Sequence, residues 1–335
     1  MLVFPPDILR TEIALPSSKS ISNRALVIRA LSGGDMPIDN VSDCDDSRVV
    51  EEALRLMPRV VDIKAAGTAM RFMTSLLAVL GGDHIITGTD RMQRRPIAVL
   101  VDALRSLGAD IAYMDMEGFP PLRIRGGRLT GGRLALPGNV SSQYISSLLM
   151  IAPTLKDGLV LELTGEVISR PYIDMTLAIM QQFGARAKWS DERTVCVEPV
   201  RYSPIPYYIE SDWSAASYWY EMVALAADPG AEVSLPGLFQ NSLQGDSKVA
   251  ELFSRLGVET RFCDNAVRLV KCSCDDGAFE CNLVEHPDLA QTIVVTCCMM
   301  GKHFRISGLQ TLRIKETDRI AALQKELGKL GFEIG

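Results

Sequence analysis

Four stretches of the chain share one pattern of apolar and polar positions. The pattern predicts an amphipathic helix, then Leu or Phe, then Gly, then a strand, and the stretches are LVDALRSLGADIAY, TLAIMQQFGARAKW, VAELFSRLGVETRF and LQKELGKLGFEIG. Their glycines, Gly108, Gly184, Gly257 and Gly331, follow one another at intervals of 76, 73 and 74 residues. We expect each glycine to take the left-handed conformation that ends a helix before the next strand.

A repeat of about 75 residues is too long for a solenoid, and it predicts a module of two helices and about four strands. The first three copies continue into a second strand and turn, PPLRIRGG, RTVCVEP and AVRLVKCS, whereas the fourth reaches Gly335 as its strand begins. The repeat therefore predicts α/β layers around helices, with the last module incomplete.

The stretch at residues 197–212, VEPVRYSPIPYYIESD, interrupts this regularity. It carries three prolines and little periodicity, so it is interpreted as extended chain that crosses between two domains. A length of 335 residues also suggests about two domains.

Composition narrows the class of ligand. Hydrophobic residues make up 47% and charged residues 23%, as in an ordinary globular protein, while a net charge of −6 and a pI near 5.3 argue against a nucleic-acid binder. No apolar run approaches the roughly 20 residues of a membrane span, and the first residues do not resemble a secretion signal, so a cytoplasmic protein is expected. Any anionic ligand must then be held by local cations.

The cysteines and histidines give little sign of a metal site. The eight cysteines show no paired CxxC spacing and the three histidines lie far apart in sequence, so neither a zinc site nor a disulfide framework is indicated. Cys272, Cys274 and Cys281 could form a metal cluster, but reduced cysteines in a strand and its turn are the favoured interpretation.

Four predicted helix starts place a small or hydroxyl residue near a cation. They are LPSSKSISNRALVIRAL, where Ser20 or Ser22 is the expected cap beside Lys19 and Arg24, AAGTAMRFMTSLLAV, TGTDRMQRRPIAVLVDAL and LPGNVSSQYISSLLM. A helix N-terminus offers free N–H groups and the positive end of a dipole, so it binds phosphate or carboxylate when cations lie beside it. One such start indicates only a capped helix, whereas four favour a polyanionic ligand.

Other charged positions allow both a structural and a functional interpretation. The segment RIKETDRI, residues 313–320, is either a solvated helix start or part of an anion site. Asp212 and Asp288 both suit the N-cap of the helix that follows them, and Asp288 could also be a base if a substrate hydroxyl lies against it.

Eight segments, in their order and approximate spacing, resemble the family of 5-enolpyruvylshikimate-3-phosphate synthases over essentially the whole chain. They are LPSSKSISNRA, AGTAMR, RMQRRPI, PGNVSSQY, SRPYIDMT, SDWSAASY, HPDLAQT and RIKETDR. The resemblance implies a two-domain inside-out α/β barrel built from repeated βαβαββ units, the last unit incomplete. It implies one domain of three units at residues 17–210, a second domain at residues 1–16 plus 211–335 that lacks its final part, and a substrate site in the cleft.

The resemblance also implies a reaction. The family transfers the enolpyruvyl group of phosphoenolpyruvate to the 5-hydroxyl of shikimate 3-phosphate and releases phosphate, a step toward chorismate and the aromatic amino acids. The chemistry is an addition followed by an elimination, which needs clamps for two phosphates and a carboxylate and groups that move protons. The implied protein is a cytoplasmic monomer with no metal or organic cofactor and no nucleic-acid or membrane partner.

Roles for the matched residues follow from the same resemblance. The residues assigned to catalysis are Lys19, Asp288 and Glu316. Those assigned to shikimate 3-phosphate are Lys19, Ser20, Arg24, Ser141, Ser142, Gln143, Ser169, Tyr172, Asp288 and Lys315. Those assigned to phosphoenolpyruvate are Lys19, Gly67, Arg95, Gln143 and Arg319. If the last segment is helical, Lys315 and Arg319 share a face, where two cations repel unless an anion lies between them.

The sequence departs from the family in composition and in length. Ala65 and Phe72 stand where Asn and Pro are common, which leaves the shape of the phosphoenolpyruvate pocket and the sensitivity to glyphosate open, and Thr311 stands where an Asn often binds shikimate. Family members usually continue for half a module to a full one, which brings a further Arg and Lys for phosphoenolpyruvate. An alternative hypothesis is therefore a catalytically impaired fragment that binds shikimate 3-phosphate weakly.

A second alternative is the related transferase that acts on UDP-N-acetylglucosamine. That enzyme typically carries a reactive Cys in a mobile loop before the RPI-like segment, whereas residues 81–95 contain none. The KETDR and SKSISNR segments also favour the shikimate enzyme.

Overall fold

The computed structural model describes residues 7–314 and 317–335. The chain divides into two compact units. Ser17–Ile209 form the inserted unit, while the chain before Ser17 and Glu210–Gly335 together form the split unit.

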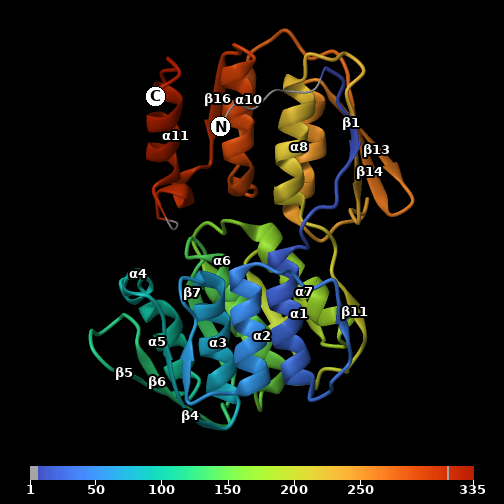
Figure 1. Cartoon of the computed structure of the whole chain (residues 1–335). Helices are drawn as coiled ribbons and strands as arrows, with labels where there is room; N and C mark the ends of the chain where they lie inside the picture. Colours follow the sequence, from blue (N-terminus) through green and yellow to red (C-terminus); the bar gives the residue numbers. More distant parts are fainter. Residues whose placement is uncertain (1–6, 315–316) are drawn as a thin grey trace. The chain divides into compact units, whose positions relative to one another are not determined.

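The inserted unit contains helices and strands that alternate along the chain (Figure 1). Its helices are α1 (Lys19–Ser32), α2 (Asp45–Leu56), α3 (Gly67–Val79), α4 (Asp90–Gln93), α5 (Ala98–Ser106), α6 (Ser142–Ile151), α7 (Arg170–Gln182) and the 3-10 turn η1 (Ala152–Thr154). Its strands are β2 (Ile38–Asp39), β3 (Val60–Asp62), β4 (Gly82–Thr87), β5 (Asp110–Tyr113), β6 (Leu122–Gly126), β7 (Gly132–Pro137), β8 (Leu159–Thr164), β9 (Ala187–Trp189), β10 (Thr194–Val197) and β11 (Tyr207–Tyr208).

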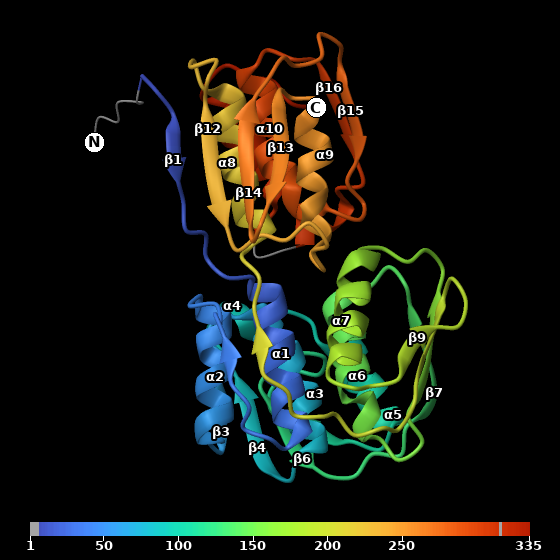
Figure 2. The same cartoon turned by 90° about the vertical axis from the view of Figure 1, so that its right-hand side faces the viewer.

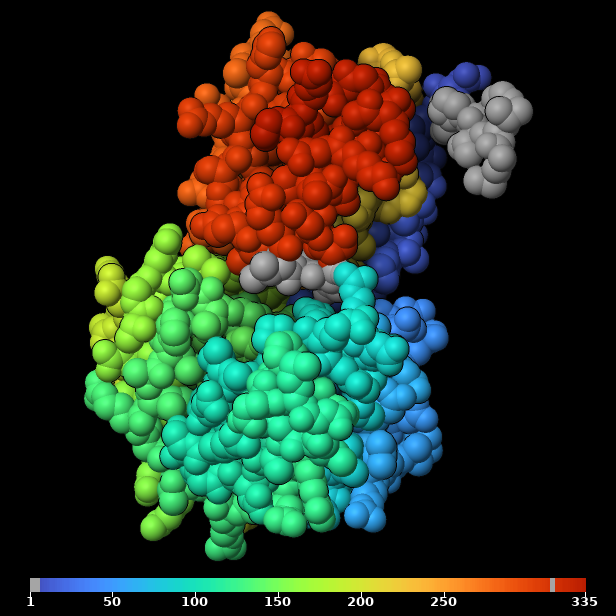
Figure 3. Space-filling model, turned by 90° about the vertical axis from the view of Figure 1, so that its left-hand side faces the viewer, coloured from blue at the N-terminus to red at the C-terminus, as the bar shows by residue number. Residues whose placement is uncertain are grey.

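The split unit has the same mixture of elements. Its helices are α8 (Trp213–Leu225), α9 (Val249–Ser254), α10 (Ala290–Met299), α11 (Arg319–Gly328) and the 3-10 turns η2 (Gly245–Lys248), η3 (Pro287–Leu289) and η4 (Gln310–Ile314). Its strands are β1 (Arg10–Glu12), β12 (Glu232–Pro236), β13 (Val258–Cys263), β14 (Ala266–Lys271), β15 (Phe279–Asn282) and β16 (Phe304–Ser307). Figure 3 shows the face of this unit that is formed by the last part of the chain, coloured orange to red.

One sheet topology occurs three times. The four-stranded sheets have the orders β3-β4-β6-β5, β7-β8-β10-β9 and β1-β12-β14-β13. In each sheet the first two strands are parallel and the remaining pairs are antiparallel, as a βαβαββ module requires. In the third copy, β1 precedes the inserted unit while its partners follow that unit. The predicted long-period repeat is therefore confirmed.

The glycine of each repeat ends a helix as the sequence pattern predicts. Gly108, Gly184, Gly257 and Gly331 have φ values of 100°, 86°, 85° and 87°, which a residue with a Cβ atom rarely adopts. The fourth copy differs from the prediction after that point, because residues 332–335 pair with no strand among the described residues. Phe332 and Ile334 instead pack beside a small cluster that includes Leu327 of α11.

In the inserted unit, α1, α2 and α3 lie side by side (Figures 1 and 2). Helix α3 packs against α1, α2 and α6, and its residues from Gly67 through Ala78 are all buried. A helix can be buried on every side only if apolar and small residues surround its axis, as in GTAMRFMTSLLAV. This central helix fixes the positions of its neighbours.

A buried carboxylate anchors the beginning of the split unit after the crossing. Glu210 is 4% exposed, and its Oε1 accepts hydrogen bonds from Trp213 Nε1 at 2.8 Å and Phe239 N at 2.9 Å. Its Oε2 accepts from Ser242 Oγ at 2.6 Å and Gln244 Nε2 at 3.0 Å. Four donors thus offset the cost of burying this charge.

Glu210→Ala is expected to lower the free energy of unfolding by about 3 kcal/mol, because buried donors such as Trp213 Nε1 lose their acceptor. Urea unfolding followed by circular dichroism measures the change. Glu259→Ala is the control, since Glu259 is exposed and pairs with Arg261 at the surface of the same unit. Equal stability of the two variants would show that the Glu210 contacts contribute little.

Candidate functional site

Helix α1 begins with a cation at its positive end. Ser18, in an extended conformation, is the N-cap and its Oγ accepts from Ile21 N at 3.5 Å, so the prediction of Ser20 or Ser22 as the cap is wrong. The cap must precede the first helical residue, which is Lys19. Lys19 is exposed and the first turn holds no acidic residue, so the helix dipole repels its ammonium. An anion at this point would relieve the repulsion.

Arg24, one turn further along α1, is buried and connects α1 to α7. Its Nη1 donates to Ser20 O at 2.8 Å and its Nη2 donates to Tyr172 O at 3.3 Å. Desolvation lowers the pKa of Arg24 to about 10, so the guanidinium still carries its charge at neutral pH. The structure thus brings the predicted residues of α1 and α7 together.

The start of α3 faces two guanidinium groups. A Cβ atom on Gly67 would lie 2.4 Å from Arg95 Nη1 and 3.3 Å from Arg71 Nη1. Arg71 Nη1 also donates to Gly67 O at 2.9 Å. The side chain that Gly67 lacks would therefore crowd Arg95 itself, so the glycine lets the Arg95 guanidinium lie against the first turn of α3.

The start of α6 lies against the start of α3. Ser141 is the N-cap of α6, and its Oγ accepts from Gln143 N at 3.4 Å. Gln143 Nε2 donates to Thr68 Oγ1 in the first turn of α3 at 3.2 Å. Ser142 is the first residue of α6. The predicted hydroxyl and amide groups of this segment therefore lie close to the Gly67 segment.

Helix α7 begins at an unusual backbone conformation. Ser169, its N-cap, has φ 54° and ψ 37° and is only 7% exposed, and its side chain makes no cap hydrogen bond. Such a left-handed conformation costs free energy in a residue other than glycine and is enriched at ligand sites. The preceding Ile168 N donates to Gly138 O at 3.2 Å, which holds this turn beside the PGNVSS loop.

Two predicted site residues of the split unit, Asp288 and Arg319, form an ion pair. Arg319 Nη1 lies 2.9 Å from Asp288 Oδ1, and the two side chains are 28% and 23% exposed. Gln291 joins them when its amide is oriented to satisfy its neighbours, with its nitrogen 2.8 Å from Asp288 O and its oxygen 3.1 Å from Arg319 Nη1. Asp288 lies within η3 and does not cap α10, whose N-cap is Leu289, so that structural prediction is wrong.

The charged segment before α11 is partly outside the described residues, which omit Lys315 and Glu316. Helix α11 begins at Arg319, because Asp318 is its extended N-cap and its Oδ1 accepts from Ala321 N at 3.0 Å. The expected helical face shared by Lys315 and Arg319 involves a residue outside the described ones and stays a prediction. Asp212 does cap α8 as predicted, accepting from Ala215 N at 2.9 Å.

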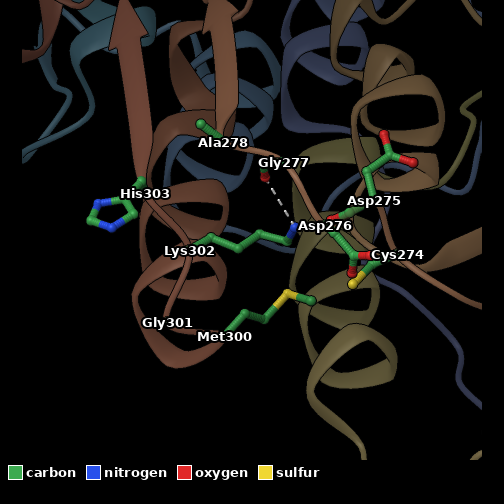
Figure 4. Close-up of a pocket in the computed structure, with 9 residues that line it drawn as sticks. All are labelled: Cys274, Asp275, Asp276, Gly277, Ala278, Met300, Gly301, Lys302 and His303. Atoms are coloured by element: carbon green, nitrogen blue, oxygen red, sulfur yellow. Dashed lines mark hydrogen bonds between the residues drawn. The ribbon is translucent and has the colours of Figure 1, made fainter.

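Neither Asp288 nor Arg319 lines either of two cavities in the split unit. One of about 310 Å³ is lined by Cys274, Asp275, Asp276, Gly277, Ala278, Met300, Gly301, Lys302 and His303 (Figure 4). Lys302 Nζ extends across it to Gly277 O at 3.4 Å, so the lysine is engaged by backbone carbonyls. A second cavity of about 260 Å³ includes His286 but not Asp288. Neither cavity contains a residue that the sequence assigned to a ligand.

Residues 7–314 and 317–335 contain neither a group of metal-ligating side chains nor a membrane-spanning helix. Within those ranges, no three His, Cys, Asp or Glu side chains are placed to hold a metal ion. No helix in the same ranges has both the length and the apolar character to span a bilayer.

A family model and curated relatives each match nearly the whole chain. The family model described as "EPSP synthase (3-phosphoshikimate 1-carboxyvinyltransferase)" matches residues 3–60 and 56–335. A 3-phosphoshikimate 1-carboxyvinyltransferase of Bacteroides fragilis is 55% identical over 331 residues, covering 99% of this chain and 80% of the relative. One from Vibrio cholerae is 36% identical over 358 residues, covering 98% of this chain and 83% of the relative.

Solved structures show the same fold. An EPSP synthase from Acinetobacter baumannii superposes with a TM-score of 0.78 at 20% identity, covering 97% of this chain and 79% of that one. A second structure of EPSP synthase from the same organism gives a TM-score of 0.62 at 16% identity, with 97% of each chain covered.

Proposed function

Because the chain belongs to the EPSP synthase family, we propose that it transfers the enolpyruvyl group of phosphoenolpyruvate to the 5-hydroxyl of shikimate 3-phosphate and releases phosphate. The observation that carries the proposal is the set of contacts that join the starts of α1 and α7, of α3 and α6, and the turns before α6 and α7, in a unit that has Lys19, Arg24, Arg71 and Arg95 at or near these starts. Such a cluster of N–H groups and cations suits ligands with several negative charges.

We assign shikimate 3-phosphate mainly to the starts of α1, α6 and α7. The residues in this assignment are Lys19, Ser20, Arg24, Ser141, Ser142, Gln143, Ser169 and Tyr172, together with Asp288 and Lys315 of the split unit. Hydroxyl groups and helix N–H groups at the α6 and α7 starts suit the 3-phosphate. The left-handed Ser169 supports this assignment, because a strained N-cap that makes no cap hydrogen bond leaves its hydroxyl for another acceptor or donor.

We assign phosphoenolpyruvate to Lys19, Gly67, Arg95, Gln143 and Arg319. Arg95 and Arg71 frame the start of α3, and a guanidinium can hold a carboxylate or phosphate through two parallel hydrogen bonds. Gly67 leaves room for the Arg95 guanidinium beside the first turn of α3.

The reaction requires proton transfers in two directions. In the addition step, the 5-hydroxyl of shikimate 3-phosphate loses its proton to Asp288 while its oxygen forms a bond to the enol carbon, and the adjacent methylene carbon gains a proton. In the elimination step, that carbon loses a proton and the C–O bond to phosphate breaks. We assign the proton exchange with carbon to Lys19 and Glu316. Since a carboxylate paired with a guanidinium accepts protons less readily, we expect phosphoenolpyruvate to draw Arg319 away from Asp288 before the hydroxyl is deprotonated.

The remaining sequence predictions stay part of the proposal. We expect domains at residues 17–210 and at residues 1–16 plus 211–335, each an inside-out α/β barrel. The protein is expected to act as a cytoplasmic monomer with no nucleic-acid partner and without a metal or organic cofactor.

The test measures the release of phosphate from phosphoenolpyruvate in three reactions. One contains shikimate 3-phosphate as the acceptor, the second contains UDP-N-acetylglucosamine, and the third contains no acceptor. We expect release only with shikimate 3-phosphate. Release supported by the nucleotide sugar, or equal release without an acceptor, would contradict the proposed function.

Arg95→Ala is expected to raise the KM for phosphoenolpyruvate about 100-fold, because a charge-assisted contact with the ligand is worth about 2 to 3 kcal/mol. The KM for shikimate 3-phosphate should change far less. Arg94→Ala is the matched control, since Arg94 is the exposed neighbour of Arg95. Steady-state kinetics with each substrate varied in turn measures both constants. An unchanged KM for phosphoenolpyruvate would remove Arg95 from that site.

A further inference from the structure

A buried hydroxyl group joins three helices of the inserted unit. Thr176 Oγ1, on α7, accepts a hydrogen bond from Arg24 Nε of α1 at 2.7 Å. It also lies 2.8 Å from Ser146 Oγ of α6 and 2.8 Å from Tyr172 O, so its single proton goes to one of these acceptors at a time. Thr176 and Ser146 are both fully buried. The hydroxyl therefore belongs to a closed polar network rather than to the solvent-facing surface.

The network uses nearly all of the hydrogen-bonding capacity of Arg24. A guanidinium has five N–H donors, and four of them are directed at protein acceptors. These acceptors are Thr176 Oγ1, Ser20 O, Ser146 Oγ and Tyr172 O. The group also stacks over the Phe72 ring, 5.3 Å from its centroid. At most one N–H remains for a substrate, so the main contribution of Arg24 must be to the arrangement of the surrounding helices.

On α6 and α7, the residues of this network lie one helical turn after the proposed ligand residues. Tyr172 precedes Thr176 by one helical turn on α7, and Ser142 precedes Ser146 by one turn on α6. Because residues four apart share a helix face, the network fixes the faces on which the ligand residues lie. A buried network with every member satisfied gives one arrangement of its helices, whereas an incomplete one allows several.

We propose that Thr176 is a positioning residue for shikimate 3-phosphate: its hydroxyl holds Arg24 and Ser146 so that the starts of α1, α6 and α7 keep the spacing that one phosphate-bearing ligand requires. The inference rests on the proposed function for the identity of the ligand. It does not place Thr176 in contact with substrate.

The test compares Thr176→Val, which has the same shape without the hydroxyl, with Thr176→Ser, which retains it. Isothermal titration calorimetry with shikimate 3-phosphate should show a dissociation constant about ten-fold higher for T176V, the equivalent of about 1.4 kcal/mol. T176S should bind nearly as the unaltered chain does. This rescue by the conservative variant separates the hydroxyl from the volume of the side chain.

Ser147→Ala is the matched control. Ser147 is also on α6, is 1% exposed, and its Oγ forms a buried pair with Ser75 Oγ at 2.8 Å that does not involve Arg24. S147A should lower stability while leaving the affinity for shikimate 3-phosphate unchanged. A loss of affinity in S147A equal to that in T176V would show that any buried hydroxyl has this effect, and would overturn the inference.

Hydrogen exchange without ligand provides the second readout. The first turns of α6 and α7 should exchange faster in T176V than in S147A or the unaltered chain, because those turns lose their fixed positions. Unchanged exchange and unchanged affinity in T176V would overturn the inference and leave the proposed function standing. Absence of binding by the unaltered chain would overturn the proposed function instead, while the exchange data would still decide whether Thr176 orders the helix starts.

Discussion

Lys19→Met is expected to lower kcat at least about 100-fold, the usual contribution of a positioned acid or base, while the substrate KM values change less. Lys19 is the exposed first residue of α1, so its ammonium lies near the N–H groups at the start of the helix. The first turn of α1 holds no carboxylate that could neutralise this charge. Methionine keeps the length of the side chain but can neither carry a proton nor hold an anion. Single-turnover kinetics separates the chemical step from substrate binding.

Lys188→Met provides the control for Lys19, because Lys188 is exposed on β9 and makes no predicted ligand contact. Its kcat should equal that of the unaltered chain. If K19M keeps a near-normal kcat, Lys19 has no role in proton transfer, and a rise in KM alone would limit it to binding.

Asp288→Asn should also lower kcat about 100-fold or more, because the amide cannot accept the proton of the 5-hydroxyl. Asn can still accept a hydrogen bond from Arg319 through its oxygen, so the position of Arg319 and the KM for phosphoenolpyruvate should change little. Stopped-flow and steady-state kinetics measure both quantities.

Asp264→Asn is the corresponding control in the split unit, since Asp264 is exposed in the turn between β13 and β14. It should leave both constants unchanged. A D288N variant that raises KM but retains kcat would identify Asp288 as a partner of Arg319 rather than as a base.

The repeated architecture could be predicted because its signals are local. A helix pattern followed by Gly108, Gly184 or Gly257 marks the same left-handed turn in each copy, and the strands on either side have partners within the same module. The fourth copy shows the limit of such signals. Its helix and its turn at Gly331 form as predicted, but residues 332–335 form no strand in the described structure, because a strand also needs a neighbour to pair with.

Helix starts were predicted less accurately than helices. Several serines in SSKSIS are equally good caps by type, and only the backbone conformation selects Ser18. Similarly, only the backbone conformation identifies Asp318 as the N-cap of α11. The left-handed Ser169 carries no signal in its sequence, since serine is not a residue that favours positive φ.

The supporting residues were missed because their roles depend on packing between distant segments. Thr176 lies mid-helix and Ser146 follows an ordinary apolar pattern, so neither differs from a structural residue until α1, α6 and α7 are assembled. Gln291 had a weak signal, since it follows Asp288 by three residues at the beginning of a helix. Arg71 was visible in the GTAMR segment, but its contact with Gly67 O was not.

Phosphorus NMR of the chain with both substrates tests the central claim most directly, because it follows both phosphates at once. We predict that the phosphoenolpyruvate signal falls, inorganic phosphate rises in equal amount, and the shikimate 3-phosphate signal moves to that of a product that keeps its 3-phosphate and carries the carboxyvinyl ether. Formation of pyruvate and phosphate with shikimate 3-phosphate unchanged, or loss of the 3-phosphate itself, would contradict enolpyruvyl transfer.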